Sequence, residues 1–209
     1  MSGYFLINTL HADDMTLING CISQLEKRVA DGYQIEQVLF YGQGAIQALL
    51  RSKAAKCWQA FSQKHSVPLR VCANSAVSRG VLDEILAKEE GAALSMNGDF
   101  QVTSLAIAFD QMAKARHVCS VDQLRDVTAT DNTVAVIFNT LDSDSLDFKD
   151  GLDFLLLAAS LDWKVTVIFQ EEKCFNVSLK DLFALYEVSD VRFSDNGFNE
   201  KEFKLVITF

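Results

Sequence analysis

The sequence predicts an α/β protein built from two consecutive units, each a parallel-type sheet with helices on both faces. Several segments, such as Tyr4-Phe-Leu-Ile7 and Val38-Leu-Phe-Tyr41, are short, continuous apolar runs. Such runs are typical of parallel strands that are buried on both faces. With 49% hydrophobic residues, 22% charged residues and a single proline, the chain has the composition of a folded protein rather than a disordered one.

An internal repeat indicates that the chain holds two related units. The segment 5–10 recurs in weakened form as the segment 136–141, and Gly20 and Gly151 are separated by the same interval as Asn8 and Asn139. In each half, an apolar strand is followed by an acidic turn, an amphipathic helix and a second apolar strand. We therefore expect one domain over residues 1–124 and a second, shorter one over 131–209, joined by the polar stretch 122–132.

In the first half, Asp13 or Asp14 suits the N-cap of the first helix, and Gly32 suits a stop just beyond its end. A polar insertion follows the Cys72 turn, at residues 83–100, as a surface loop or a mobile flap. The strands are expected near residues 4–9, 35–41, 68–73 and 116–121, and the helices near 14–30, 43–64 with a break around Ser52, and 102–114.

In the second half, apolar runs again alternate with amphipathic segments. The strands are expected near residues 133–139, 164–170, 190–194 and 203–209, and the helices near 147–161 and 178–187.

Charge and composition exclude several classes of function. Residues 1–129 hold 12 basic and 13 acidic side chains, whereas the remainder holds 7 basic and 15 acidic ones. An acidic half repels phosphate backbones, so we expect no direct nucleic-acid binding. No apolar run is long enough to cross a bilayer and the N-terminus lacks the features of a signal peptide, so we expect a soluble cytoplasmic protein without membrane contact.

Cys72 is the strongest candidate for a reactive residue. It ends the buried-strand pattern Val67–Cys72 and is followed at once by the helix-start residues Ala73-Asn-Ser75. Sites in open parallel sheets lie beyond the carboxyl ends of the strands, and free N–H groups at a helix start stabilise an anion and lower the pKa of a thiol. Arg79 lies one turn further on and adds positive charge. The alternative is that Cys72 is a small, buried core residue.

The other cysteines and the histidines are weaker candidates. Cys21 and Cys119 are expected in the core, with Cys119 as a conceivable secondary sulfur site, and Cys57 is expected to be partly exposed. Cys174 follows two glutamates, which would raise the pKa of its thiol. No C-x-x-C pair or nearby histidine suggests a metal site, and we expect neither a metal nor a cofactor. His11 could assist proton transfer but is more simply a surface turn residue.

The segment Arg70–Glu84 resembles the active-cysteine segment of the TusD/DsrE family of sulfur-relay subunits, in which a cysteine closes the third strand. The similarity extends to residues 30–45, 58–68 and 98–105, and so covers nearly all of residues 4–121. The second half resembles the companion subunit TusC/DsrF in its segments 151–160, 165–169, 179–183 and 203–209, in shortened form. The acidic turn 11–14 departs from the glycine-containing turn of the family.

This resemblance implies two DsrE-like units and a sulfurtransferase that carries sulfur as a persulfide. Cys72 would accept a sulfane sulfur from a TusA-like donor protein and pass it to a TusE/DsrC-like acceptor. The persulfide would be stabilised by Asn74, Ser75 and Arg79. Tus and Dsr subunits assemble, so the resemblance also implies a homo- or hetero-oligomer, with a TusB/DsrH-like subunit as a further partner. The pathway would be tRNA 2-thiouridine synthesis or sulfur oxidation.

Two other hypotheses remain open. In the first, the chain is a non-catalytic DsrE-like binding or assembly module with a buried Cys72. In the second, it is a small nucleotide- or flavin-binding protein, which only the sheet topology and the turn Gly42-Gln-Gly44 suggest. That turn lacks the third glycine and the downstream acid of a dinucleotide-binding fingerprint, and a tight turn explains it.

Overall fold

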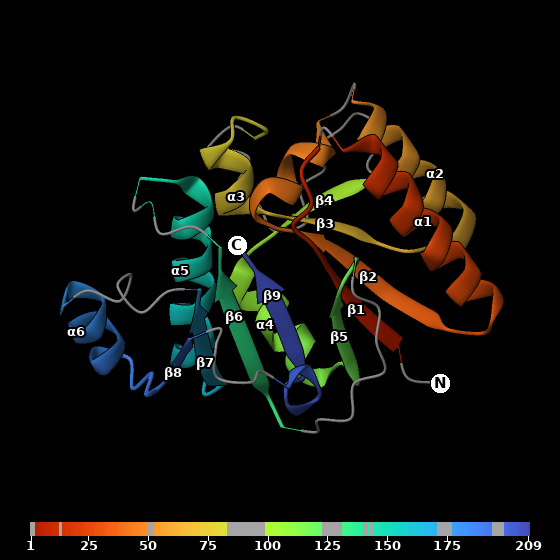
Figure 1. The fold of residues 1–209 in the computed structure, drawn as a ribbon. Helices are drawn as coiled ribbons and strands as arrows, with labels where there is room; N and C mark the ends of the chain where they lie inside the picture. The colour runs from red at the N-terminus through yellow and green to blue at the C-terminus, as the bar shows by residue number, and fades with distance from the viewer. Residues whose placement is uncertain are drawn as a thin grey trace. The chain divides into compact units, whose positions relative to one another are not determined.

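The computed structural model describes residues 3–12, 14–49, 52–82, 99–122, 131–139, 142, 144–170, 177–193 and 199–209. The chain divides into two compact units, Met1–Arg125 and Asp126–Phe209 (Figure 1). Most of the expected insertion at 83–100, and Cys174, lie outside the described residues. No described helix has the length and apolarity that crossing a membrane requires.

The first unit is a parallel sheet of five strands in the order β4-β3-β2-β1-β5. The strands are β1 (Gly3–Asn8), β2 (Gln34–Phe40), β3 (Leu69–Cys72), β4 (Phe100–Thr103) and β5 (His117–Ser120). The helices are α1 (Met15–Ala30), the 3₁₀ helix η1 (Gly42–Ala48), α2 (Lys53–His65), α3 (Ala73–Ser78) and α4 (Leu105–Lys114). In Figure 1, α1 and α2 run beside each other along the sheet.

Short polar side chains cap the starts of α1 and α2. The carboxylate of Asp14 accepts a hydrogen bond from the N–H of Leu17, at 2.8 Å, and so caps α1. Ser52 caps α2 in the same way, which confirms the expected break of the long helical segment. Beyond the end of α1, Gly32 has φ = +91°, a left-handed conformation that glycine adopts without steric cost.

One strand was missed by the sequence prediction. The polar insertion was expected to end at residue 100 and the next helix to begin near residue 102, but residues 100–103 form β4, which pairs with β3. Four residues are too few for a clear alternating pattern. Phe100, Val102 and Thr103 favour strands, but so short a run is stable as a strand only when it pairs with β3. Helix α4 therefore begins at Leu105, after its N-cap Ser104, and not near residue 102.

The second unit is a parallel sheet of four strands in the order β8-β7-β6-β9. If β6 corresponds to β1, this order is that of the first unit without β4. Its elements are β6 (Thr133–Phe138), α5 (Leu146–Ser160), β7 (Lys164–Phe169), α6 (Val177–Leu185), β8 (Asp190–Phe193), the 3₁₀ helix η5 (Glu200–Glu202) and β9 (Leu205–Thr208). The predicted fold class, α/β with two consecutive parallel-sheet units, is confirmed.

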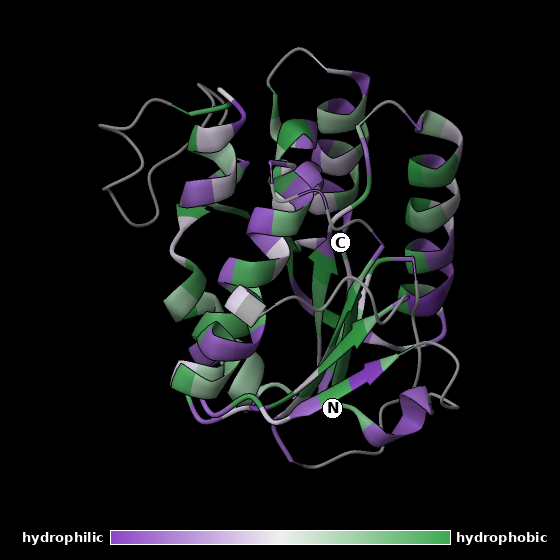
Figure 2. Cartoon of the chain, turned by 60° about the vertical axis from the view of Figure 1, so that its left-hand side comes forward, coloured by the Kyte–Doolittle hydropathy of each residue, from purple (hydrophilic) through white to green (hydrophobic). Residues whose placement is uncertain are grey.

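Aromatic side chains fill the core between this sheet and its helices. The ring of Phe169 in β7 stacks with the rings of Phe138 in β6 and Phe183 in α6. On the opposite face of the sheet, a second buried cluster contains Ala135, Ile168, Phe203 and Val206. Figure 2 shows the distribution of hydrophobic residues along the chain. The strands are largely hydrophobic, whereas the helices alternate hydrophobic and hydrophilic residues.

Only part of the sequence repeat has a structural counterpart. Asn8 and Asn139 both lie at the carboxyl end of the first strand of their unit. The repeated glycines differ, because Gly20 is exposed on α1 whereas Gly151 is buried in α5. A Cβ atom on Gly151 would lie 2.5 Å from the ring of Phe138, so this glycine is required by close packing.

Candidate functional site

Cys72 lies at the carboxyl end of β3, as the sequence predicted. It pairs with Thr103 of β4 and is followed directly by α3, of which it is the N-cap residue. Its side chain makes no capping hydrogen bond to the first turn of that helix. This placement at the carboxyl edge of a parallel sheet agrees with the region where such sheets hold their sites.

The thiol of Cys72 is not open to solvent. Only 1% of the residue is exposed, so the expectation of an accessible sulfur at the sheet edge is wrong for this state of the chain. The pattern Arg70-Val-Cys72 correctly indicated a strand end, but it carries no information about what covers that end. A thiol of another protein could therefore reach Cys72 only if the surrounding side chains moved.

The three residues expected to stabilise a persulfide have different surroundings. Asn74 is exposed, Ser75 is 1% exposed, and Arg79 is half-buried. The Oγ of Ser75 accepts a hydrogen bond from the backbone N–H of Gly42, at 3.1 Å. The hydroxyl of Ser75 thus fixes the turn after β2 against α3, a structural task that the sequence did not reveal.

Arg79 lies at the end of α3, one turn beyond Ser75. Its Nη1 donates to the Oγ of Ser78, at 3.3 Å. The Oγ of Ser78 also reaches the carbonyl oxygen of Ser75, at 3.2 Å. The guanidinium group is therefore held beside the last turn of α3, the short helix that follows Cys72.

A buried polar network at the carboxyl end of β1 was not predicted. The Oε1 of Gln47 accepts hydrogen bonds from the Nδ2 of Asn8, at 3.0 Å, and from the Nε1 of Trp58, at 2.6 Å. The Nε2 of Gln47 donates to the carbonyl oxygen of Leu10, at 2.6 Å. All of these groups are satisfied, so the network fixes η1 against the turn after β1. The only sequence feature that singled out a residue of this network was the recurrence of Asn8 as Asn139.

The turn Gly42-Gln-Gly44 is explained by packing and backbone conformation. Gly42 has φ = +56°, and a Cβ atom on Gly44 would lie 1.9 Å from the carbonyl oxygen of Asn8. Both glycines are thus required by the fold, as the tight-turn interpretation expected. His11 is exposed in the turn after β1.

The remaining described cysteines behave as packed or half-exposed thiols. Cys119 is 1% exposed and Cys57 is half-buried. Cys21 is 3% exposed, and burial raises the pKa of its thiol to about 11, with a further contribution from the nearby carboxylates of Asp122 and Asp14. A raised pKa removes thiolate at neutral pH, so Cys21 is a poor nucleophile. The described residues contain no cluster of metal-ligating side chains.

Comparison with known proteins gives two informative similarities. The sulfurtransferase TusD of Proteus mirabilis is 39% identical over 82 residues, which cover 35% of this chain and 63% of the relative. The sulfurtransferase TusD of Erwinia tasmaniensis is 35% identical over 85 residues, which cover 37% of this chain and 66% of the relative. Over these residues, the chain is similar to sulfurtransferases TusD.

This similarity confirms the resemblance to TusD that the sequence suggested. The chain spans somewhat less than two thirds of the length of the curated relatives that it matches. No family model matches it. The TusC-like interpretation of the second unit stays a prediction.

Proposed function

We propose that this chain is a cytoplasmic sulfur-relay protein that carries a sulfane sulfur as a persulfide on Cys72. The observation that carries the proposal is the similarity to two sulfurtransferases TusD, together with a cysteine at the carboxyl end of β3. The sulfur would be used in tRNA 2-thiouridine synthesis or in sulfur oxidation.

The proposed transfer is an exchange at sulfur. The thiolate of Cys72 attacks the outer sulfur of a cysteine persulfide on the donor protein. A new sulfur–sulfur bond forms at Cys72 while the bond in the donor breaks, and the donor cysteine leaves as a thiolate that takes up the proton lost by Cys72. An acceptor cysteine then repeats the same attack on the Cys72 persulfide. Neither step needs a metal, an organic cofactor or an external oxidant.

Three residues in or next to α3 support the persulfide in this proposal. A persulfide is an anion near neutral pH, and α3, which follows Cys72, holds Asn74 in its first turn and ends at the C-cap residue Arg79. Ser75 acts by position, since its hydroxyl holds the N–H of Gly42 and so fixes the start of α3 next to Cys72. Charge from Arg79 would favour the anion once it forms.

The burial of Cys72 makes access the controlling step. With 1% of the residue exposed, a donor or acceptor cysteine reaches the sulfur only after a displacement of the surrounding chain. Helix α3 has six residues and is joined to the turn after β2 by the Gly42–Ser75 hydrogen bond. We propose that docking of a partner displaces α3, so that the thiol is protected from oxidation between transfers.

The partners expected for this role are proteins. We propose a TusA-like persulfide donor, a TusE/DsrC-like acceptor and a TusB/DsrH-like subunit in a homo- or hetero-oligomer. The second unit, which we propose to be a shortened TusC/DsrF-like domain, contributes to that assembly. Residues 130–209 hold 7 basic and 15 acidic side chains, which disfavours direct contact with tRNA.

A second candidate function is favoured by one observation, the burial of Cys72. In this alternative, the chain is a non-catalytic binding or assembly module that retains the DsrE-like architecture. Cys72 would then pack in the core as a small hydrophobic side chain.

Peptide-resolved mass spectrometry after mild treatment with a persulfide donor separates the two candidates. The relay predicts that the peptide with Cys72 gains the mass of one sulfur atom, and that a reductant or an acceptor thiol removes it. In the Cys72→Ser variant, this gain should disappear while the fold remains unchanged.

Cys119 is a matched control, since it is also 1% exposed and lies in the same sheet. Sulfur on Cys72 but not on Cys119 supports a specific site. Equal modification of both indicates general opening of the unit, and no modification of Cys72 in the presence of partner proteins supports the binding module instead.

A further inference from the structure

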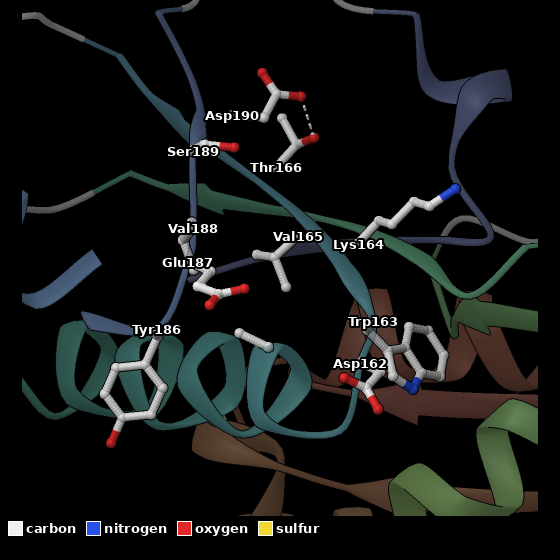
Figure 3. A pocket seen from close by; sticks show the side chains of 11 residues that line it. Asp162, Trp163, Lys164, Val165, Thr166, Tyr186, Glu187, Val188, Ser189 and Asp190 are labelled. Atoms are coloured by element: carbon white, nitrogen blue, oxygen red, sulfur yellow. Dashed lines mark hydrogen bonds between the residues drawn. The ribbon is translucent and has the colours of Figure 1, made fainter. Parts of the chain in front are cut away.

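A pocket in the second unit lies at the amino ends of its strands, opposite to the edge where parallel sheets usually hold their sites. It has a volume of about 440 Å³. Figure 3 shows that its lining comes from two turns, one between α5 and β7 and the other between α6 and β8. The lining residues are Ala159, Asp162, Trp163, Lys164, Val165, Thr166, Tyr186, Glu187, Val188, Ser189 and Asp190.

The two turns that form this pocket have the same backbone design. After α5, the N–H of Trp163 bonds to the carbonyl oxygen of Ala158, and Asp162 has φ = +60°. After α6, the N–H of Val188 bonds to the carbonyl oxygen of Phe183, and Glu187 has φ = +57°. Each helix thus presents its carboxyl end to the pocket, and each left-handed position carries an acidic residue. The negative end of a helix dipole favours a cation nearby.

The carboxylates of Asp162 and Glu187 have no cationic partner within the part of the chain that the structure describes. Lys164 is the one basic residue in the lining, and its Nζ pairs with Asp131, at 3.2 Å. In Figure 3, the side chain of Lys164 extends away from Glu187. The pocket therefore has two carboxylates whose negative charge is not paired with the basic residue of its lining.

The third carboxylate of the pocket, Asp190, is already neutralised. It accepts hydrogen bonds from the guanidinium of Arg192, at 2.9 Å, and from the hydroxyl of Thr166, at 2.6 Å. The hydrogen bond from Arg192 is the main reason why the pKa of Asp190 lies below its ordinary value. Asp190 and Thr166 thus form a fixed wall of the pocket (Figure 3).

Apolar groups lie beside these charges. Val165 and Val188 are buried and contribute aliphatic surface to the pocket. Three large hydrophobic residues adjoin or belong to the same two turns and are exposed: Leu161 by 42%, Leu185 by 77% and Tyr186 by 37%. Exposed apolar side chains around a polar pocket are typical of a surface for protein partners.

We propose that this pocket binds a basic side chain, an arginine or a lysine, of a partner protein segment that also carries apolar residues. The aliphatic stem of such a side chain would pack on Val165 and Val188, and its charged head would meet the carboxylates of Asp162 and Glu187. The apolar neighbours in the partner segment would cover Leu161 and Leu185. Charge complementarity selects this occupant, because the free charges of the pocket are negative.

This site is independent of sulfur chemistry at Cys72, so it can be tested separately. We would titrate the full ¹⁵N-labelled chain with a capped pentapeptide that has one arginine between two leucines, and record amide chemical shifts. We expect shifts concentrated at Val165, Glu187 and Ser189, and binding that weakens as the salt concentration rises. A control peptide has citrulline, the neutral analogue of arginine, in place of the arginine and should bind several-fold more weakly.

Two variants test the carboxylates. Glu187→Gln should weaken binding of the arginine peptide about threefold, as expected for one exposed ion pair. Adding Asp162→Asn should weaken it by about tenfold in total. Asp181→Asn is the matched control, because it removes an exposed acid of α6 outside the pocket and should leave binding unchanged.

Several outcomes would overturn the proposal. These are equal binding of the arginine and citrulline peptides, shifts centred away from the pocket, and equal effects of the Glu187 and Asp181 variants. Shifts of the same amides with Mg²⁺ but not with the arginine peptide would assign the pocket to an inorganic cation. Shifts that grow with protein concentration alone would assign it to a second copy of the chain.

Discussion

The backbone N–H of Gly42 and the hydroxyl of Ser75 are joined by a hydrogen bond of 3.1 Å, although 33 residues separate them in the chain. Both residues are buried. Because α3 starts immediately after Cys72, this bond connects the position of the candidate sulfur carrier to the turn after β2.

Replacing Ser75 by alanine should weaken this connection. The N–H of Gly42 would be left buried without its acceptor, which costs about 1–3 kcal/mol in the free energy of unfolding. Urea denaturation measures this loss. The Ser78→Ala variant, on the exposed side of the same helix, should change the free energy by less than about 0.5 kcal/mol. Equal effects of the two variants would show that the hydroxyl of Ser75 has no special role.

Two glycines should respond to alanine in opposite directions. The Cβ atom in Gly44→Ala would meet the backbone oxygen of Asn8 at 1.9 Å, and backbone cannot move aside as a flexible side chain can. We expect a loss of at least about 3 kcal/mol. Gly20→Ala, on the exposed face of α1 with no atom within 4 Å of the new Cβ, should gain about 1 kcal/mol. Thermal melting of both variants checks the sign of each change.

Cys21 should make the free energy of unfolding decrease at alkaline pH. Its thiol has an ordinary pKa of 9.0, which burial raises to about 11 in the native chain. The unfolded chain thus loses this proton at lower pH than the native chain does. The resulting contribution to stability is fully present below pH 9 and is lost as the pH rises through about 11.

Denaturation curves between pH 8 and about 11 test this dependence. The Cys21→Ala variant should lose stability less steeply over this range than the original chain. The Asp122→Asn variant should lower the pKa of Cys21, because it removes a nearby negative charge that raises this pKa. Peptide-resolved alkylation of Cys21 gives the same pKa by an independent route. A midpoint near 9 in the native chain would contradict the prediction.

Glu187 should be destabilising in its present position. Its φ of +57° is a conformation that glycine adopts freely and that a side chain with a Cβ atom disfavours. Glu187→Gly is expected to raise the free energy of unfolding by about 1 kcal/mol, as measured by urea denaturation. Glu187→Ala is the matched control. It removes the same carboxylate but retains the Cβ atom, so it should bring no such gain.

Some strands and helix boundaries could be predicted from the sequence, whereas others, and the burial of single residues, could not. The strand β3 and the break at Ser52 follow from local patterns, an apolar run and a capping hydroxyl, and both were predicted. Strand β4 was missed because its four residues become a strand through pairing with β3. The burial of Cys72 could not be predicted either, because it depends on neighbours that are distant in the chain.

The sequence by itself determined the succession of strands and helices apart from β4, the division into two units and the place of Cys72 at the end of its strand. These features depend on periodicity, capping residues and glycines, which act over a few neighbouring residues. Only the tertiary structure decided which groups meet. In the folded chain, Gln47 is hydrogen-bonded to Asn8 and Trp58. Cys72 is buried at the end of β3, and Asp162 and Glu187 line the same pocket. Such contacts are set by the packing of whole elements, and no local pattern records them.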